Sequence, residues 1–298
     1  MRVLLYIILI PCLLTACECK NKEVKAIEKP ERVIVIGQST LEFMLGFGLE
    51  DKIAGIAQVD IQNTRYDSLM NELPIITRQW PSKEAILSLR PDLIYSMESA
   101  FRGERIGSLK FWHQRGIPTF QINDYTFGKS LSSYRKDLID SGVIFEKEKE
   151  VNDYLNHLDA VIEDIKQKRN LNSTSTTPNI LFLACVGPIY YYYPPSLCVL
   201  DEIIEDCGGK FLNLGDRSII LSIEALLKVN PDKIILSQYL HSDAENALNK
   251  LLQNKMLRHI SAIKNQDILT IDYTNAVSGS LELPQVYKSV YSFIHPNQ

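Results

Sequence analysis

A thirteen-residue segment occurs twice in the chain, 140 residues apart. Residues 82–94 (SKEAILSLRPDLI) and residues 222–234 (SIEALLKVNPDKI) are identical at seven positions. Each copy has a serine where a helix would begin and a Pro-Asp pair where it would end. Serine caps helix N-termini, and proline ends a helix because it has no N–H donor. The repeat therefore predicts two α/β units of similar plan.

Short apolar runs follow both copies of the repeat and occur elsewhere in each unit. The runs are residues 33–36, 53–57, 93–95, 179–184, 234–236 and 268–271. Runs of this length beside helices are typical of buried parallel strands. A chain of 298 residues is also long enough for about two domains.

A helical pattern lies between the two units, at residues 146–169. Its apolar residues are separated by 3, 1, 3, 4 and 3 positions: Val151, Tyr154, Leu155, Leu158, Ile162 and Ile165. This spacing predicts one long amphipathic helix of about 36 Å, close to the diameter of a domain. Such a helix would be a stiff connection between the units.

These patterns predict an α/β fold with two Rossmann-like lobes. Each lobe has a central, mostly parallel sheet, a single long α-helix joins the lobes, and a ligand cleft lies between them. We expect the first lobe at residues 30–142, the linking helix at 143–170 and the second lobe at 171–298. An amphipathic helix at residues 284–295 would end the second lobe.

The N-terminus has the features of an export signal. Arg2 precedes an apolar run from Val3 to Leu14, which is shorter than the ~20 residues of a membrane-spanning helix. The sequence that ends this run, LLTAC at residues 13–17, resembles the lipobox of bacterial lipoproteins. We therefore expect a signal peptide at residues 1–16, a lipid on Cys17 and a flexible tether at residues 17–29. A plain signal peptide with a chance cysteine is the alternative.

Composition narrows the possible functions. The formal net charge of −4 argues against a nucleic-acid partner. The five histidines are scattered, so no metal site is expected. Three cysteines lie in the body of the chain, Cys185, Cys198 and Cys207. Export permits one disulfide among them, but buried free thiols are an equal alternative.

The order of several motifs resembles a known family. They are residues 30–42, 48–55, 81–92, 222–232 and 257–272, behind the lipobox. In this order they are similar to the substrate-binding lipoproteins of bacterial ABC importers for ferric siderophores, haem and cobalamin, the class III periplasmic binding proteins. The resemblance extends from about Pro30 to Pro296. It implies a monomeric, lipid-anchored receptor in the cell envelope, on the periplasmic or extracytoplasmic face.

The same resemblance implies a function. The receptor would capture an iron complex, a ferric siderophore first and haem or cobalamin next, and deliver it to an ABC permease. It would be a binding protein without a cofactor, not an enzyme. Two rival functions are a tethered extracytoplasmic enzyme and a surface interaction protein. The chain lacks a Gly-x-Ser-x-Gly elbow, a phosphate loop and a Rossmann glycine fingerprint, which argues against the enzyme.

Glu84 and Glu224 occupy equivalent positions in the repeat. In the family that the chain resembles, each lobe presents one exposed glutamate to an arginine pocket on the permease, and these two residues match. Two carboxylates held apart on a rigid body would fix the docking orientation. Alternatively, each carboxylate only complements the dipole of its own helix, an effect of ~0.3–1 kcal/mol.

Ligands of open α/β sheets bind beyond the carboxyl ends of the strands, so the loops there should line the cleft. Arginines in these loops suit the anionic oxygens of a ferric chelate. The tyrosine run at residues 190–193 offers flat faces to a ligand, or equally forms an edge strand with alternate side chains buried. Tyr239 and His241 could also ligate haem iron. The candidate ligand-binding residues are Gln38, Ser39, Arg78, Trp80, Arg102, Arg105, Tyr190, Tyr192, Arg217, Tyr239 and His241.

Overall fold

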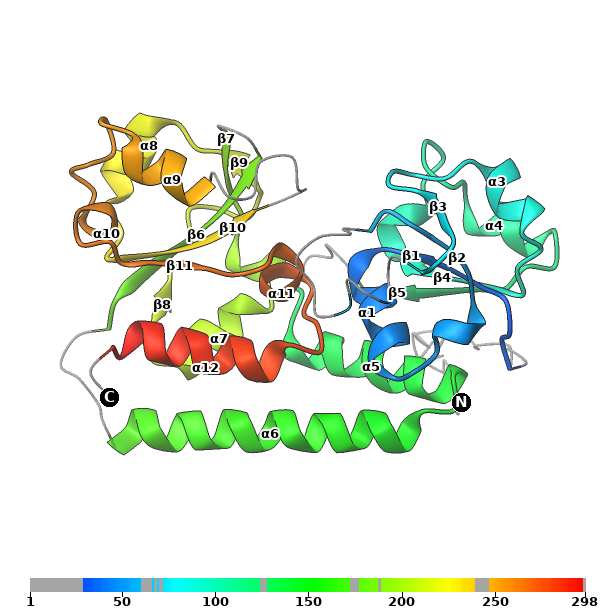
Figure 1. The fold of residues 1–298 in the computed structure, drawn as a ribbon. Coiled ribbons are helices and arrows are strands. Elements are labelled where there is room, and N and C mark those ends of the chain that lie inside the picture. The colour runs from blue at the N-terminus through cyan, green and yellow to red at the C-terminus, as the bar shows by residue number, and fades with distance from the viewer. Residues whose placement is uncertain are drawn as a thin grey trace, which may run out of the picture.

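The computed structural model describes residues 29–59, 66, 69, 72–123, 128–171, 177–186, 189–238 and 247–296. Within these residues the chain forms two β-sheets, each with its own helices, and a long helix, α6, that runs beneath both (Figure 1). The predicted two-lobe α/β arrangement is confirmed. The residue boundaries given above for the lobes stay a prediction.

The first sheet is parallel throughout, with the strand order β3-β2-β1-β4-β5. Its central strand β1 is fully buried, as its unbroken Val/Ile sequence requires. The strands are β1 (Val33–Ile36), β2 (Ile53–Ala57), β3 (Ile75–Thr77), β4 (Leu93–Met97) and β5 (Thr119–Ile122). The helices are α1 (Gln38–Gly46), α3 (Lys83–Ser88), α4 (Leu109–His113) and α5 (Leu131–Ile144), with 3-10 turns η1 (Glu50–Lys52) and η2 (Glu98–Phe101).

The second sheet is mixed, with the strand order β11-β10-β6-β7-β9. Strands β10, β11 and β8 extend it in parallel, whereas β7 runs antiparallel to both β6 and β9. The strands are β6 (Asn179–Val186), β7 (Ile189–Tyr192), β8 (Lys210–Phe211), β9 (Ile219–Ile220), β10 (Lys233–Gln238) and β11 (Ile268–Thr270). The helices are α7 (Leu200–Asp206), α8 (Ile223–Val229), α9 (Ala247–Gln253), α10 (Ser261–Lys264), α11 (Tyr273–Val277) and α12 (Leu283–Ile294), with the 3-10 turn η3 (Pro195–Leu197).

The two copies of the repeat have the same local structure. The Ser82 and Ser222 hydroxyls each accept a hydrogen bond from the backbone N–H three residues later, at 3.1 and 3.2 Å, and so cap α3 and α8. The aspartate of each Pro-Asp pair also has one role in both lobes. Asp92 accepts from the N–H of Arg32 just before β1, at 2.9 Å, and Asp232 accepts from the N–H of Asn179 at the start of β6, at 2.8 Å. Each repeat therefore fastens its helix to the first strand of its own lobe.

Helix α6 (Glu148–Leu171) begins two residues later than the sequence pattern predicts. Its apolar stripe is buried against α5 and α12, and the predicted stripe residues lie on it, with Tyr154 only partly buried. Helix α12 confirms the predicted final helix. Among the described residues, none of the helices combines the length and the apolar character that crossing a bilayer requires.

Candidate ligand site and docking surface

A small cavity marks the place where the lobes meet. Its volume is about 20 Å³, room for roughly one water molecule. The lining comes from α1, β4, β5, α5 with the segment before it, and the segment after α11. It consists of Ser39, Phe43, Tyr95, Ile122, Lys129, Tyr134, Asp137, Leu138, Ser278, Gly279, Ser280 and Leu281. A cavity of this volume has no room for a chelate.

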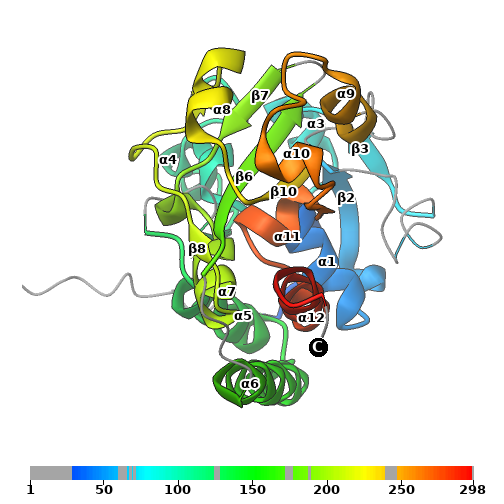
Figure 2. The same cartoon turned by 90° about the vertical axis from the view of Figure 1, so that its left-hand side faces the viewer.

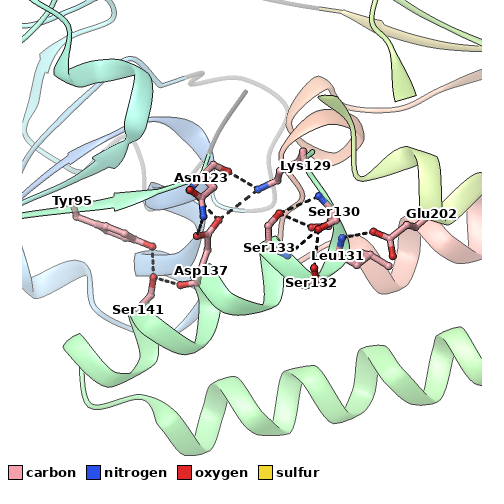
Figure 3. A network of polar contacts seen from close by, with 10 residues as sticks. All are labelled: Tyr95, Asn123, Lys129, Ser130, Leu131, Ser132, Ser133, Asp137, Ser141 and Glu202. Carbon is pink, nitrogen blue, oxygen red and sulfur yellow. Dashed lines mark hydrogen bonds and ion pairs between the residues drawn. The ribbon is translucent and has the colours of Figure 1, made fainter. Parts of the chain in front are cut away.

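A buried ion pair lines this cavity (Figure 3). The ammonium of Lys129 lies 3.6 Å from a carboxylate oxygen of Asp137, and their side chains are only 2% and 9% exposed. The Lys129 ammonium also donates to the carbonyl of Asn123 at 2.6 Å. The backbone and side-chain N–H groups of Asn123 donate to the two oxygens of Asp137, at 3.1 and 3.0 Å. Burial raises the pKa of Asp137 to about 6, although Lys129 and Asn123 act in the opposite direction.

The start of α5 is tied to the second lobe. The N–H groups of Gly128 and Lys129 donate to the carbonyl of Ser196, at 2.8 and 3.0 Å. The N–H of Leu131 donates to the carboxylate of Glu202 on α7, at 2.7 Å (Figure 3). Because the first N–H groups of a helix lack partners within the helix, this carboxylate caps α5 from the other lobe. The lobes are thus joined here as well as through α6.

Two predicted ligand residues come together in the first lobe. Trp80 lies between β3 and α3, and Arg105 lies in the segment that follows β4. The Arg105 guanidinium stacks 4.2 Å from the centre of the Trp80 ring and donates to the carbonyl of Ser99 at 2.9 Å. Both side chains are half-buried. Stacking and the hydrogen bond fix the guanidinium at the carboxyl edge of the sheet, where a ligand is expected.

The other predicted residues are more dispersed. Gln38 and Ser39 begin α1, where Gln38 donates to the carboxylate of Glu42 at 2.9 Å and Ser39 lines the cavity. Arg78, Arg102 and Arg217 are exposed. Tyr239, His241 and Cys17 lie outside the described residues.

The tyrosine run has the second of its two predicted structures, a strand with alternate side chains buried, although β7 lies between β6 and β9 and not at the edge of the sheet. Tyr190 and Tyr192 are only 8% and 0% exposed, because β7 turns its even-numbered side chains into the core of the second lobe. The hydroxyl of Tyr192 donates to the carbonyl of Gly215 at 3.1 Å and accepts from the N–H of Leu214 at 2.8 Å. The assignment of these two tyrosines to the ligand is therefore corrected. Tyr191 and Tyr193, on the opposite face, keep partly exposed rings.

The body cysteines are not cross-linked. Cys185, Cys198 and Cys207 are buried free thiols. Burial raises the pKa of Cys185 to about 12, so this thiol is neutral and unreactive. In the described part of the chain, no three His, Cys, Asp or Glu residues gather as metal ligands would.

The two candidate docking glutamates are exposed in the first turns of α3 and α8. Helices α3 and α8 lie on the side of the molecule opposite α6, one on each lobe (Figures 1 and 2). Backbone and Ser222 hydrogen bonds lower the pKa of Glu224. The repeat thus places Glu84 and Glu224 on one side of the molecule, each on a capped helix.

Two α/β lobes joined by one long helix are the architecture of a bilobal binding protein. The chain belongs to the periplasmic binding protein family, whose model matches residues 33–274. It is therefore a binding protein and not an enzyme.

Two curated relatives come from Bacillus subtilis (strain 168). The petrobactin-binding protein YclQ is 24% identical over 260 residues, 83% of this chain and 76% of the relative. The putative ABC transporter substrate-binding lipoprotein YhfQ is 24% identical over 275 residues, 82% of this chain and 77% of the relative.

Solved structures share the fold. A periplasmic binding protein from Veillonella parvula DSM 2008 has a TM-score of 0.76 at 20% identity, covering 90% of this chain and 86% of that one. A periplasmic heme-binding protein from Pseudomonas aeruginosa has a TM-score of 0.69 at 19% identity, covering 90% of this chain and 94% of that one.

Proposed function

We propose that this protein is the solute receptor of an ABC importer and that its ligand is an iron complex, with a ferric siderophore ranked before haem and cobalamin. The observation that carries the proposal is the two-lobe fold together with similarity to a petrobactin-binding protein over 83% of the chain. The receptor captures its ligand between the lobes and delivers it to the permease.

The ligand is anionic. Arg105, stacked on Trp80, presents a fixed guanidinium at the carboxyl edge of the first sheet. A guanidinium held in this way pairs with carboxylate or catecholate oxygens at little entropic cost. Arg78, Arg102 and Arg217, which are exposed in loops beside strands, add positive charge along the path of the ligand. Gln38 and Ser39 contact the ligand near the small cavity, and Tyr239 and His241 are the remaining candidate ligand residues.

Glu84 and Glu224 dock the receptor on its permease. Both carboxylates are exposed, and their helices α3 and α8 lie on the side opposite α6. A partner with two cationic pockets can therefore contact both lobes at once, which fixes the orientation of the complex.

The receptor is a monomer held at the outer face of the membrane. Residues 1–16 are the signal, Cys17 carries the lipid, and residues 17–29 tether the two lobes, residues 30–142 and 171–298. The lipobox at residues 13–17 supports this proposal, as does the relative YhfQ, which is named a lipoprotein.

The ligand proposal is tested by tryptophan fluorescence and thermal unfolding. Trp80 is half-buried beside Arg105, whereas Trp112 is fully buried, so a ligand in the cleft should quench Trp80. The probes are ferric petrobactin, a ferric hydroxamate, haemin and cobalamin, with Trp80→Phe as the control for the fluorescence signal. A ligand at about 100 times its Kd adds about 2.7 kcal/mol to the free energy of unfolding. Failure of all four probes to bind would refute the ligand classes proposed.

A further inference from the structure

The side chains of strands β7 and β9 alternate between the two faces of the second sheet. Tyr191 pairs with Ile220 and Tyr192 pairs with Ile219 in an antiparallel ladder. Directly paired residues of such a ladder point to the same side, and neighbours along a strand point to opposite sides. Ile220 therefore shares a face with Tyr191, whereas Ile219 lies on the face of Tyr192, which is buried in the core of the second lobe.

The face that carries Tyr191 is apolar and accessible. Ile220 is 60% exposed and Ile189, two residues before Tyr191 on β7, is 37% exposed. Tyr191 between them is only partly buried. Single exposed apolar residues are common on protein surfaces, but a contiguous group of them marks a binding surface.

This row leads to the junction of the lobes. Tyr193 continues it, and its ring packs edge-on against Tyr273 with the centroids 5.6 Å apart. Tyr273 begins α11, the helix between the lobes in Figure 1, and the segment after α11 lines the interlobe cavity. Three residues after Tyr193, the carbonyl of Ser196 accepts the hydrogen bonds from the first lobe.

We propose that Ile189, Tyr191 and Ile220 form an apolar wall of the ligand cleft that packs against a flat aromatic part of the ligand. The inference rests on the proposed function and narrows the ligand to one with a flat aromatic part. A phenol ring flanked by two isoleucines offers a broad face for offset stacking and little hydrogen bonding. The shared ligand chemistry is a planar ring, supplied by a catecholate chelate or by a porphyrin. The anionic atoms of the same ligand contact Arg105 on the first lobe.

The pair Ile219 and Ile220 supplies a matched control, because the two residues are neighbours on β9 with opposite faces and exposures of 46% and 60%. Ile220→Ser and Tyr191→Leu remove parts of the wall. Ile219→Ser makes the same chemical change on the other face, and Tyr191→Phe keeps the ring. Thermal unfolding of each variant verifies that it is folded. The probes are a ferric tris-catecholate, haemin and ferrioxamine, an aliphatic hydroxamate chelate.

We expect one of the two aromatic probes, the ferric tris-catecholate or haemin, to bind wild-type protein. The probe that binds identifies whether a catecholate or a porphyrin supplies the ring. Ile220→Ser and Tyr191→Leu should raise its Kd by about 3- to 10-fold. Ile219→Ser should bind as wild type does, and Tyr191→Phe, which keeps the ring, should raise the Kd less than Tyr191→Leu. The wall is overturned if Ile220→Ser and Tyr191→Leu bind normally, if Ile219→Ser is equally impaired, or if ferrioxamine alone binds. Binding of ferrioxamine alone would refute the apolar wall but not the proposed function, whereas failure of every chelate to bind would refute both proposals.

Discussion

The hydroxyl of Tyr134 on α5 donates a hydrogen bond of 2.6 Å to the backbone carbonyl of Ser280, which follows α11 in the second lobe. The hydroxyl of Tyr154 on α6 reaches the same carbonyl at 3.1 Å and lies 3.0 Å from the Tyr134 hydroxyl. One carbonyl thus joins the first lobe, the linking helix and the second lobe. The relative position of the lobes depends on this contact as well as on the length of α6.

Removal of the Tyr134 hydroxyl should weaken this junction. Tyr134→Phe leaves the ring in place but deletes a buried hydrogen bond, so we expect a loss of about 1–2 kcal/mol in the free energy of unfolding. Urea denaturation measures it. In the single variant, Tyr154 can still donate a hydrogen bond to the Ser280 carbonyl. The double variant Tyr134→Phe/Tyr154→Phe should therefore lose more free energy of unfolding than the sum of the losses in the two single variants. Strictly additive losses would contradict a shared contact.

Asp137 should make stability depend on pH. Burial raises its pKa from the ordinary value of 3.8 to about 6 in the folded chain. The folded state therefore holds the proton more tightly, and the resulting stabilisation is complete below about pH 4 and lost as the pH rises through 6. Relative to Asp137→Asn, the wild type should lose about 1–3 kcal/mol between pH 4 and pH 7.

Urea denaturation of both proteins at several pH values measures this difference. The comparison cancels other titrating groups, although the variant also removes the carboxylate of the Lys129 ion pair at every pH. A constant difference between the two proteins from pH 4 to pH 7 would show that the Asp137 carboxyl titrates normally.

Local sequence patterns predicted the helix caps and the two-lobe plan of this protein. The details of the site depend on tertiary packing, which these patterns do not indicate. The caps of Ser82 and Ser222 depend only on neighbouring residues, so the repeat was sufficient to find them. The tyrosine run was ambiguous, because four identical residues carry no signal for which face of β7 is buried. That choice follows from the register of β7 with β6 and β9. The pairing of Lys129 with Asp137 was not predicted either, although the two residues are close in sequence, because it depends on how the segment before α5 folds back on that helix.

Arg105 should contribute to the affinity for an anionic ligand. We expect Arg105→Gln to raise the Kd of a ferric chelate by about tenfold, the loss of one charge-assisted hydrogen bond. Arg115 is a matched control, since its guanidinium also stacks on an aromatic ring, 3.7 Å from the centre of Phe111, but is exposed after α4 and is not a candidate ligand residue. Arg115→Gln should bind normally in the same titration. Equal effects of the two variants would indicate a general influence of charge and exclude a specific contact.

Charge reversal at the docking helices should separate transport from binding. Glu84→Arg together with Glu224→Arg places two cations where the permease is proposed to have cationic pockets, so ligand uptake should be abolished while the Kd of the ligand stays unchanged. Each single variant should retain partial uptake, because one lobe still docks. Glu163→Arg on α6 is the control, since it reverses an exposed charge on the side of the molecule away from α3 and α8. Uptake that survives the double reversal, or that falls equally with Glu163→Arg, would remove these two glutamates from the docking surface.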